Sequence, residues 1–203
     1  MLKREVKAVL FDLDGVLVDS MAAWYHTYND SLKDFGFGTL QKQEFVKRFG
    51  SPIEKDIKDY FIGKTVNEVS ESYNANFKRN KEYVKLSPES ILILKKLKKQ
   101  KIKICLISNS TKFIVLTVLN HFKIRKYFDV VITMDDVKRR KPAPDMVLKA
   151  CKKLNISPKY AILVGDTKND MIAGKMAGCI TLGYKTKGDH RISHLISVAT
   201  FLK

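Results

Sequence analysis

The spacing of apolar residues changes twice along the chain. A short run at residues 6–11, interrupted only by Lys7, is typical of a buried strand. Between residues 20 and 86, apolar side chains instead recur every three or four positions, without strand-like alternation. This spacing predicts helices at about 21–35, 45–49, 53–61 and 66–84. We interpret the stretch as a small helical bundle whose aromatic residues form its core.

From residue 87 onward, short apolar runs alternate with segments of helical spacing. Strands are predicted at 102–107, 130–133, 161–164 and 180–182, and helices at 87–100, 111–121, 145–154, 170–177 and 192–202. This alternation predicts an α/β fold, a Rossmann-like parallel sheet with helices on both faces. Because the helical stretch follows the first strand, we expect an α/β core domain at 1–19 and 87–203 and an inserted α-helical cap at 20–86.

Two helix ends carry local signals in the second half of the chain. Ser87, Pro88 and Glu89 combine a capping residue, a proline and an acid, which predicts a helix start. Gly178 suits the C-terminal cap of the helix predicted at 170–177, because glycine adopts the left-handed conformation readily. These signals define the edges of helices that flank the predicted sheet.

The chain is strongly basic, with a net charge of +17 and a pI of about 9.7. Such a charge is compatible with nucleic-acid binding, and also with a lysine-rich surface that keeps a protein soluble and attracts anionic substrates. The basic residues are spread as singles and pairs over amphipathic segments, as at Lys95, Lys96, Lys98, Lys99 and Lys101. No motif that joins basic and aromatic residues for nucleic-acid recognition is visible, so we do not expect a nucleic-acid partner.

Composition also bears on the compartment. Hydrophobic residues make up 45% of the 203 residues, enough for a real core, but no apolar stretch approaches the roughly 20 residues that span a bilayer. The N-terminal residues lead directly into the first strand without room for a signal peptide, so we expect a cytoplasmic protein without a membrane partner, monomeric or a small homo-oligomer. Cys105, Cys151 and Cys179 are odd in number and widely spaced, which is typical of reduced core thiols.

The first strand ends in two carboxylates. Asp12 and Asp14 lie two residues apart, and Gly15 then ends the strand geometry. Carboxylates crowded together repel each other, and a divalent cation keeps both ionised. Further polar residues follow the later strands, at Ser108, Asn109, Lys141, Gly165 and Asp166. Ligands of parallel α/β sheets bind at the carboxyl ends of the strands, so we expect these residues to converge there.

Four motifs in this order resemble those of the haloacid dehalogenase superfamily. They are Asp12–Ser20, Ser108-Asn109, Lys141-Pro142-Ala143-Pro144-Asp145 and Gly165-Asp166-Thr167-Lys168-Asn169-Asp170. The resemblance covers residues 5–20 and 87–184, whereas residues 21–86 match only in length and helical character. It implies a core of this superfamily's fold, in the branch of phosphoglycolate phosphatases and β-phosphoglucomutase-like proteins that carry a helical cap.

The resemblance assigns the reacting groups. Asp12 would be the nucleophile that attacks phosphorus and forms an aspartyl-phosphate. Asp14 would be the general acid and base, which requires a pKa above that of a free aspartate. Dehalogenases of the superfamily carry a single acid in this motif, so Asp14 argues for phosphoryl transfer.

The remaining motif residues would hold the metal and the phosphate. The resemblance implies a Mg²⁺ ion bound by the Asp12 side chain, the Asp14 backbone carbonyl and Asp166, with Asp170 reaching it through water. It also implies that Ser108, the Asn109 backbone N–H and the catalytic Lys141 hold the phosphoryl oxygens and the charge that develops in the transfer. Asp170 equally suits a helix cap, and Ser108 and Asn109 suit capping of the following helix, so these alternatives stay open. In the cap, Arg48, Ser51 and Lys55 are candidates for reading the non-reacting end of the substrate.

These features predict a magnesium-dependent phosphatase that hydrolyses a small phosphorylated metabolite, of the phosphoglycolate type or a sugar phosphate. A β-phosphoglucomutase-like phosphomutase with the same core is an alternative, because the fold and first motif alone do not set the reaction. A basic nucleic-acid-binding protein that keeps the fold without catalysis is a further alternative.

Overall fold

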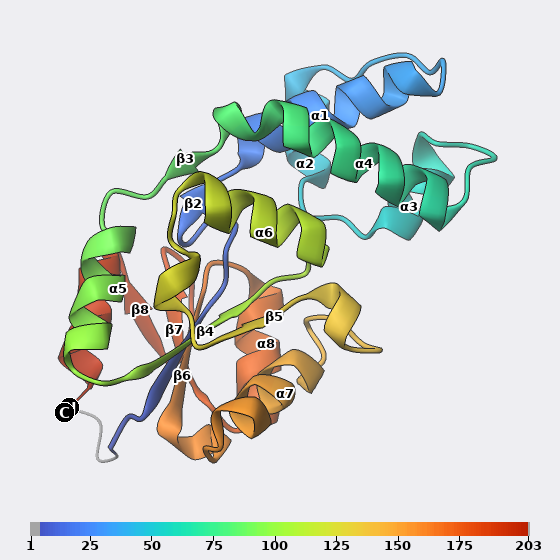
Figure 1. Cartoon of the computed structure of the whole chain (residues 1–203). Coiled ribbons are helices and arrows are strands. Elements are labelled where there is room, and N and C mark those ends of the chain that lie inside the picture. Colours follow the sequence, from blue (N-terminus) through green and yellow to red (C-terminus); the bar gives the residue numbers. More distant parts are fainter. Residues whose placement is uncertain (1–4, 203) are drawn as a thin grey trace. The chain divides into compact units, whose positions relative to one another are not determined.

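The structure, a computed structural model, describes residues 5–202 (Figure 1). Its contacts divide the chain into a core unit, Met1–Val18 with Leu86–Lys203, and a helical unit, Asp19–Lys85. Residues 1–4 and 203, which the sequence assigns to the core domain, lie outside the described residues. Each unit has its own apolar centre and is described separately below.

The core unit contains a parallel six-stranded sheet in the order β5-β4-β1-β6-β7-β8. The strands are β1 (Ala8–Phe11), β4 (Lys103–Ile107), β5 (Val130–Ile132), β6 (Ala161–Gly165), β7 (Ile180–Tyr184) and β8 (His190–Ile192). Every residue of β1 and β6 is buried, as expected for central strands covered on both faces, which explains their unbroken apolar runs. The predicted α/β fold is therefore confirmed.

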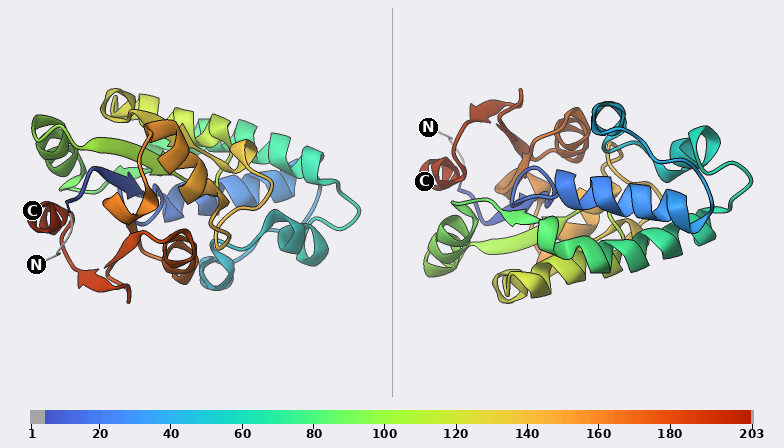
Figure 2. Two further views of the ribbon diagram at one scale, coloured as in Figure 1. Left: turned by 90° about the horizontal axis from the view of Figure 1, so that it is seen from below. Right: turned by 90° about the horizontal axis from the view of Figure 1, so that it is seen from above.

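Helices cover both faces of this sheet. The core unit contains α5 (Ser90–Lys99), α6 (Lys112–His121), α7 (Asp145–Leu154) and α8 (Lys168–Ala177). Figure 2 shows α7 and α8 on one face and α5 with the 3₁₀ helix η5 (Leu195–Phe201) on the other. α7 and α8 bury an apolar cluster that includes Leu10, Ile107 and Leu163 from three neighbouring strands. This packing covers one face of the central strands.

The helical unit consists of α1 (Met21–Asp34), α2 (Lys42–Arg48), α3 (Ile53–Asp59) and α4 (Val66–Asn80), followed by η1 (Lys81–Tyr83). Its core is aromatic and includes Tyr28, Phe45, Phe61 and Tyr73. The four predicted helices are thus confirmed, and the aromatic residues form the bundle core as expected. Where the chain passes between the units, β2 (Val18–Asp19) and β3 (Lys85–Leu86) pair in a two-stranded sheet. A strand of two residues is too short to show alternation, so the sequence did not reveal β3.

Two boundary predictions in the core unit were wrong. Helix α5 begins at Ser90 instead of Ser87, and Glu89 precedes it without a side-chain cap hydrogen bond. The Ser87 hydroxyl donates to the Val16 carbonyl at 2.9 Å. The helix predicted at 192–202 is present as the shorter 3₁₀ helix η5, and its predicted start at residue 192 belongs to β8. Only Ile192 of β8 is buried, so the strand lacks an apolar run. Gly178 does end α8, with φ of 84°, as expected.

The three cysteines are free and buried, as expected. Among residues 5–202, none of the helices has both the length and the apolar character needed to cross a membrane.

Candidate active site

Three carboxylates meet at the carboxyl end of the central strands in the core unit. Asp12 directly follows β1, Asp166 follows β6, and Asp170 lies in the first turn of α8. Each offers one oxygen, and these three oxygens lie within 4.8 Å of one another. β1 and β6 are paired neighbours, which brings residues 154 positions apart in the chain to one edge of the sheet. The predicted convergence of Asp12 and Asp166 is therefore present.

Lys141 places a positive charge between two of these carboxylates. Its Nζ donates to Oδ1 of Asp12 at 2.7 Å and to Oδ1 of Asp170 at 2.6 Å. The residue is only 5% exposed. Burial on its own would lower the pKa of Lys141, but the two adjacent carboxylates raise it above its usual range. Lys141 is therefore a permanent cation beside Asp12.

The carboxyl group of Asp12 is itself buried. Burial raises its pKa, the Lys141 ammonium opposes this rise, and Asp170 and Asp14 add to it. Asp12 and Asp170 thus share one ammonium, and further positive charge would keep Asp12 ionised. An ionised Asp12 is a nucleophile for phosphorus, whereas a protonated one is not.

Asp166 supplies the clearest test of whether the cluster fits a metal. Its Oδ1 is buried and, within residues 5–202, makes no hydrogen bond. Burial, followed by the charge of Asp170, raises the pKa of Asp166 to about 6. An unpartnered buried oxygen beside two further carboxylates is the donor set that hard divalent cations prefer. The residues therefore fit a divalent metal ion.

Two glycines make room for these carboxylates. Gly15 has φ of +79°, and a Cβ atom there would lie 2.0 Å from Oδ2 of Asp166. A Cβ atom on Gly165 would lie 2.2 Å from Cβ of Asp170. Contacts this short do not occur, so any side chain at either position would displace an acid. From the sequence, Gly15 indicated only the end of a strand, and its role beside Asp166 was missed.

Asp170 performs two structural tasks in the core unit. Its Oδ2 accepts hydrogen bonds from the Thr167 backbone amide, at 3.1 Å, and from the Thr167 hydroxyl, while the Thr167 side chain caps α8 in return. Its Oδ1 holds Lys141. The capping alternative for Asp170 is therefore present in the structure, together with a link to Lys141 that the sequence did not indicate.

Asn109 acts on Lys141 through its side chain. Its amide group donates to the Lys141 carbonyl and accepts from the Lys141 backbone amide, each at 3.0 Å. Ser108 is 1% exposed, and its hydroxyl accepts from the backbone amide of Ser110 at 3.1 Å. The Asn109 side chain therefore fixes the backbone of Lys141, and the Ser108 hydroxyl stabilises the turn after β4.

Ser110 contacts Asp14 in the site. The sequence did not predict this contact. The Ser110 hydroxyl donates to Oδ2 of Asp14 at 3.4 Å. The signal was available, since Ser110 directly follows Ser108-Asn109 at the end of β4, but serines there are common helix caps.

A family model described as haloacid dehalogenase-like hydrolase matches residues 9–184. The chain belongs to this family. Two relatives support the assignment. A phosphoglycolate phosphatase of Aquifex aeolicus is 32% identical over 180 residues, covering 87% of this chain and 83% of its own. A pyrophosphatase PpaX of Bacillus velezensis is 30% identical over 195 residues, covering 95% of this chain and 90% of its own.

A solved structure shares the fold of this haloacid dehalogenase-like hydrolase. CbbY from Rhodobacter sphaeroides, solved in complex with phosphate, superposes with a TM-score of 0.85 at 18% identity and covers 95% of this chain and 96% of its own. The predicted superfamily and the predicted hydrolase class are confirmed by the family match and the relatives.

The helical unit of this hydrolase gives the three predicted specificity residues different surroundings. The Arg48 side chain is 8% exposed, and its Nη2 lies 2.6 Å from Oδ1 of Asp56. Its guanidinium also lies over the Tyr60 ring, 4.0 Å from the centroid. Arg48 is therefore a structural part of the bundle, whereas Ser51 is half-buried and Lys55 is exposed.

Proposed function

We propose that this haloacid dehalogenase-like hydrolase is a magnesium-dependent phosphatase of a small phosphorylated metabolite. The observation that carries the proposal is the convergence of Asp12, Asp166 and Asp170 within 4.8 Å, with Lys141 bonded to two of them. Relatives named phosphoglycolate phosphatase and pyrophosphatase support phosphoglycolate and pyrophosphate as first candidate substrates, and the motif resemblance adds sugar phosphates.

The carboxylates of Asp12, Asp166 and Asp170 are the groups proposed to hold the metal, with the Asp14 backbone carbonyl as a further ligand. Bound there, Mg²⁺ would supply positive charge that lets an anionic nucleophile meet an anionic phosphate. Lys141 adds to this charge and, with Ser108 and Asn109, is proposed to hold the phosphoryl oxygens. Supporting this role, Lys141 is buried and fixed at both its ammonium and its backbone.

The proposed reaction runs in two displacements. A carboxylate oxygen of Asp12 attacks phosphorus, and Asp14 donates a proton to the leaving oxygen, giving an aspartyl-phosphate and the free product. Asp14 then takes a proton from water as the water attacks phosphorus, which releases phosphate and restores Asp12. Ser110, which donates to Asp14, would orient that carboxyl group.

The first experiment measures phosphate release from a panel of phosphoglycolate, pyrophosphate, hexose phosphates and an aryl phosphate. We expect hydrolysis of at least one with Mg²⁺, loss of activity with a chelator, and recovery when Mg²⁺ is restored in excess. Full activity in the chelator would contradict the metal dependence. Isomerised sugar phosphate without phosphate release would instead identify a phosphomutase.

A further inference from the structure

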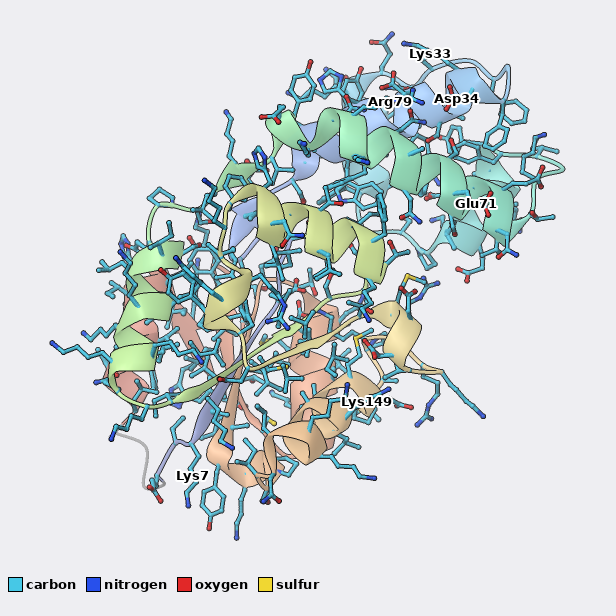
Figure 3. All side chains as sticks on the ribbon, in the orientation of Figure 1. Lys7, Lys33, Asp34, Glu71, Arg79 and Lys149 are labelled. Carbon is cyan, nitrogen blue, oxygen red and sulfur yellow. The ribbon has the colours of Figure 1, made fainter. Side chains whose placement is uncertain are left out.

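The surplus positive charge of the chain belongs almost entirely to one unit. The helical unit has 11 lysine and arginine residues against 10 acids, a net charge of +1, whereas the core unit has 27 against 11, a net charge of +16. In Figure 3, Lys33, Asp34, Glu71 and Arg79 show the mixed charges of the helical unit. If lysine and arginine were in excess over acids throughout the chain, both units would have a large positive net charge. The excess is instead confined to the core unit.

Within the core unit, basic residues gather at the amino ends of the strands. We call this set the amino-edge patch: Lys7, Lys98, Lys99, Lys101, Lys103, Lys123, Arg125, Lys126, Lys152, Lys153 and Lys159. All but Lys98, which is half-buried, are exposed. The same turns contain only two acids, Glu5 and Asp129, each already paired with a lysine of the patch. The patch therefore has a large unneutralised positive charge.

Backbone hydrogen bonds show that the patch is continuous. The Lys7 amide donates to the Tyr160 carbonyl at 2.9 Å, and the Lys103 amide donates to the Lys7 carbonyl at 3.1 Å. The Asp129 amide donates to the Ile104 carbonyl at 2.8 Å. These bonds join the starts of β6, β1, β4 and β5, four neighbours in the sheet, so the patch is about 15 Å wide at a strand spacing of about 4.8 Å. Figure 3 shows Lys7 at this edge of the core unit.

Aromatic rings lie among these cations. The Nζ atoms of Lys7 and Lys159 each lie 5.0 Å from the centroid of the Tyr160 ring. The Nζ atom of Lys126 lies 5.6 Å from the centroid of the Tyr127 ring. Both tyrosines are half-buried. Cations interleaved with aromatic rings are characteristic of surfaces that bind single-stranded nucleic acids.

We propose that the amino-edge patch binds single-stranded nucleic acid through its phosphate backbone, without sequence preference. The patch lies at the opposite ends of the strands from Asp12 and Asp166, so this binding is separate from the active site. An anionic membrane fits less well, because the large exposed apolar side chains of residues 5–202 all lie outside the patch and its turns. The patch could not be predicted from the spacing of residues along the chain, because its members come from four separate segments.

The test is fluorescence anisotropy with the 203-residue chain and a labelled 20-nucleotide RNA of mixed sequence or its DNA counterpart. We expect micromolar binding at 50 mM salt, weakened about 50-fold at 200 mM if about four phosphates are contacted. No binding up to about 100 µM protein at 50 mM salt overturns the proposal, as does binding that is insensitive to salt.

Two triple variants of equal net charge separate a local surface from overall charge. One is Lys99→Glu, Lys126→Glu and Lys159→Glu, in the patch. The control is Lys42→Glu, Lys58→Glu and Lys78→Glu, at exposed positions of the helical unit. We expect the patch variant to bind at least 10-fold more weakly and the control to stay within 2-fold of wild type, with phosphatase activity unchanged in both.

Equal weakening by both variants would overturn the proposal, since net charge alone would explain the binding. Vesicles of phosphatidylserine and phosphatidylcholine test whether the patch binds an anionic membrane. Binding to these vesicles that the patch variant abolishes, without binding to RNA or DNA, would replace the proposal with a membrane surface. Binding of inorganic polyphosphate without binding of RNA or DNA would identify polyphosphate as the ligand and would also overturn it.

Discussion

Lys141 shows how the properties of one residue in this site depend on residues far away in the chain. Its ammonium is bonded to Asp12 and Asp170, and its backbone is held by the Asn109 side chain. Burial would discharge an isolated lysine, but the two carboxylates raise its pKa, so it stays charged. Asp12, the proposed nucleophile, and its neighbouring cation are therefore held together.

The exchange Asp12→Asn tests the nucleophile. The amide keeps the size of the side chain but cannot form an acyl-phosphate, so we expect phosphate release to fall by more than about 1,000-fold. The thermal unfolding midpoint should stay within a few degrees of wild type, which shows that the fold is intact. Near-normal turnover would refute the assignment of Asp12.

The exchange Asn109→Ala tests how Lys141 is positioned. It removes two hydrogen bonds to the Lys141 backbone, and misplacement by about 1 Å can reduce a rate about 100-fold. We expect kcat to fall about 10- to 100-fold. Asn120→Ala, at an exposed position on α6, is the matched control and should retain wild-type kcat. Equal activity of the two variants would show that this clamp is dispensable.

At the scale of elements, the helical bundle depends on a buried ion pair. Arg48 ends α2 and Asp56 lies in α3, and Asp56 also accepts a hydrogen bond from the Tyr73 hydroxyl of α4 at 3.0 Å. Three helices are thus joined around one carboxylate. Burial of charge is costly, and the pair offsets that cost only while both partners are present.

The exchange Arg48→Ala tests this dependence. It leaves Asp56 buried without its partner, which costs about 3–5 kcal/mol. We expect the helical unit to unfold at much lower denaturant concentration, followed by circular dichroism and by Trp24 fluorescence. The control is Lys47→Ala, at the exposed position next to Arg48. It should change the free energy of unfolding by less than about 0.5 kcal/mol. Unchanged stability with a raised KM would instead support a role of Arg48 in substrate recognition.

At the scale of the whole molecule, charge is distributed unevenly between the two units. The core unit has a net charge of +16 and the helical unit +1. Like charges within the core unit repel one another, and dissolved salt screens this repulsion. Stability of the core unit should therefore respond to ionic strength.

We expect sodium chloride at 300 mM, compared with 20 mM, to stabilise the protein by about 1 kcal/mol, which corresponds to about 2–4 °C for a chain of this size. Differential scanning calorimetry measures the shift. The triple variant of the amino-edge patch should show a smaller shift than the helical-unit control. A midpoint that falls with salt would show that ion pairs outweigh the repulsion.

The sequence by itself determined the strand order along the chain, the position of the helical stretch and the motifs that end β1, β4 and β6. Buried parallel strands show continuous apolar runs, whereas amphipathic helices show apolar residues every three or four positions. Both patterns can be recognised from the sequence alone. The patterns failed where an element was very short, as in β3 and β8, or where tertiary partners used a capping residue differently, as at Ser87.

Only the tertiary structure decided how the motif residues act on one another. The bonds from Lys141 to Asp12 and Asp170, the clamp by Asn109 and the space that Gly15 leaves for Asp166 join residues from separate strand ends. The same holds for the amino-edge patch, whose cations are dispersed along the chain. Proximity between distant residues depends on strand pairing and register, and neither is written in the local spacing of side chains.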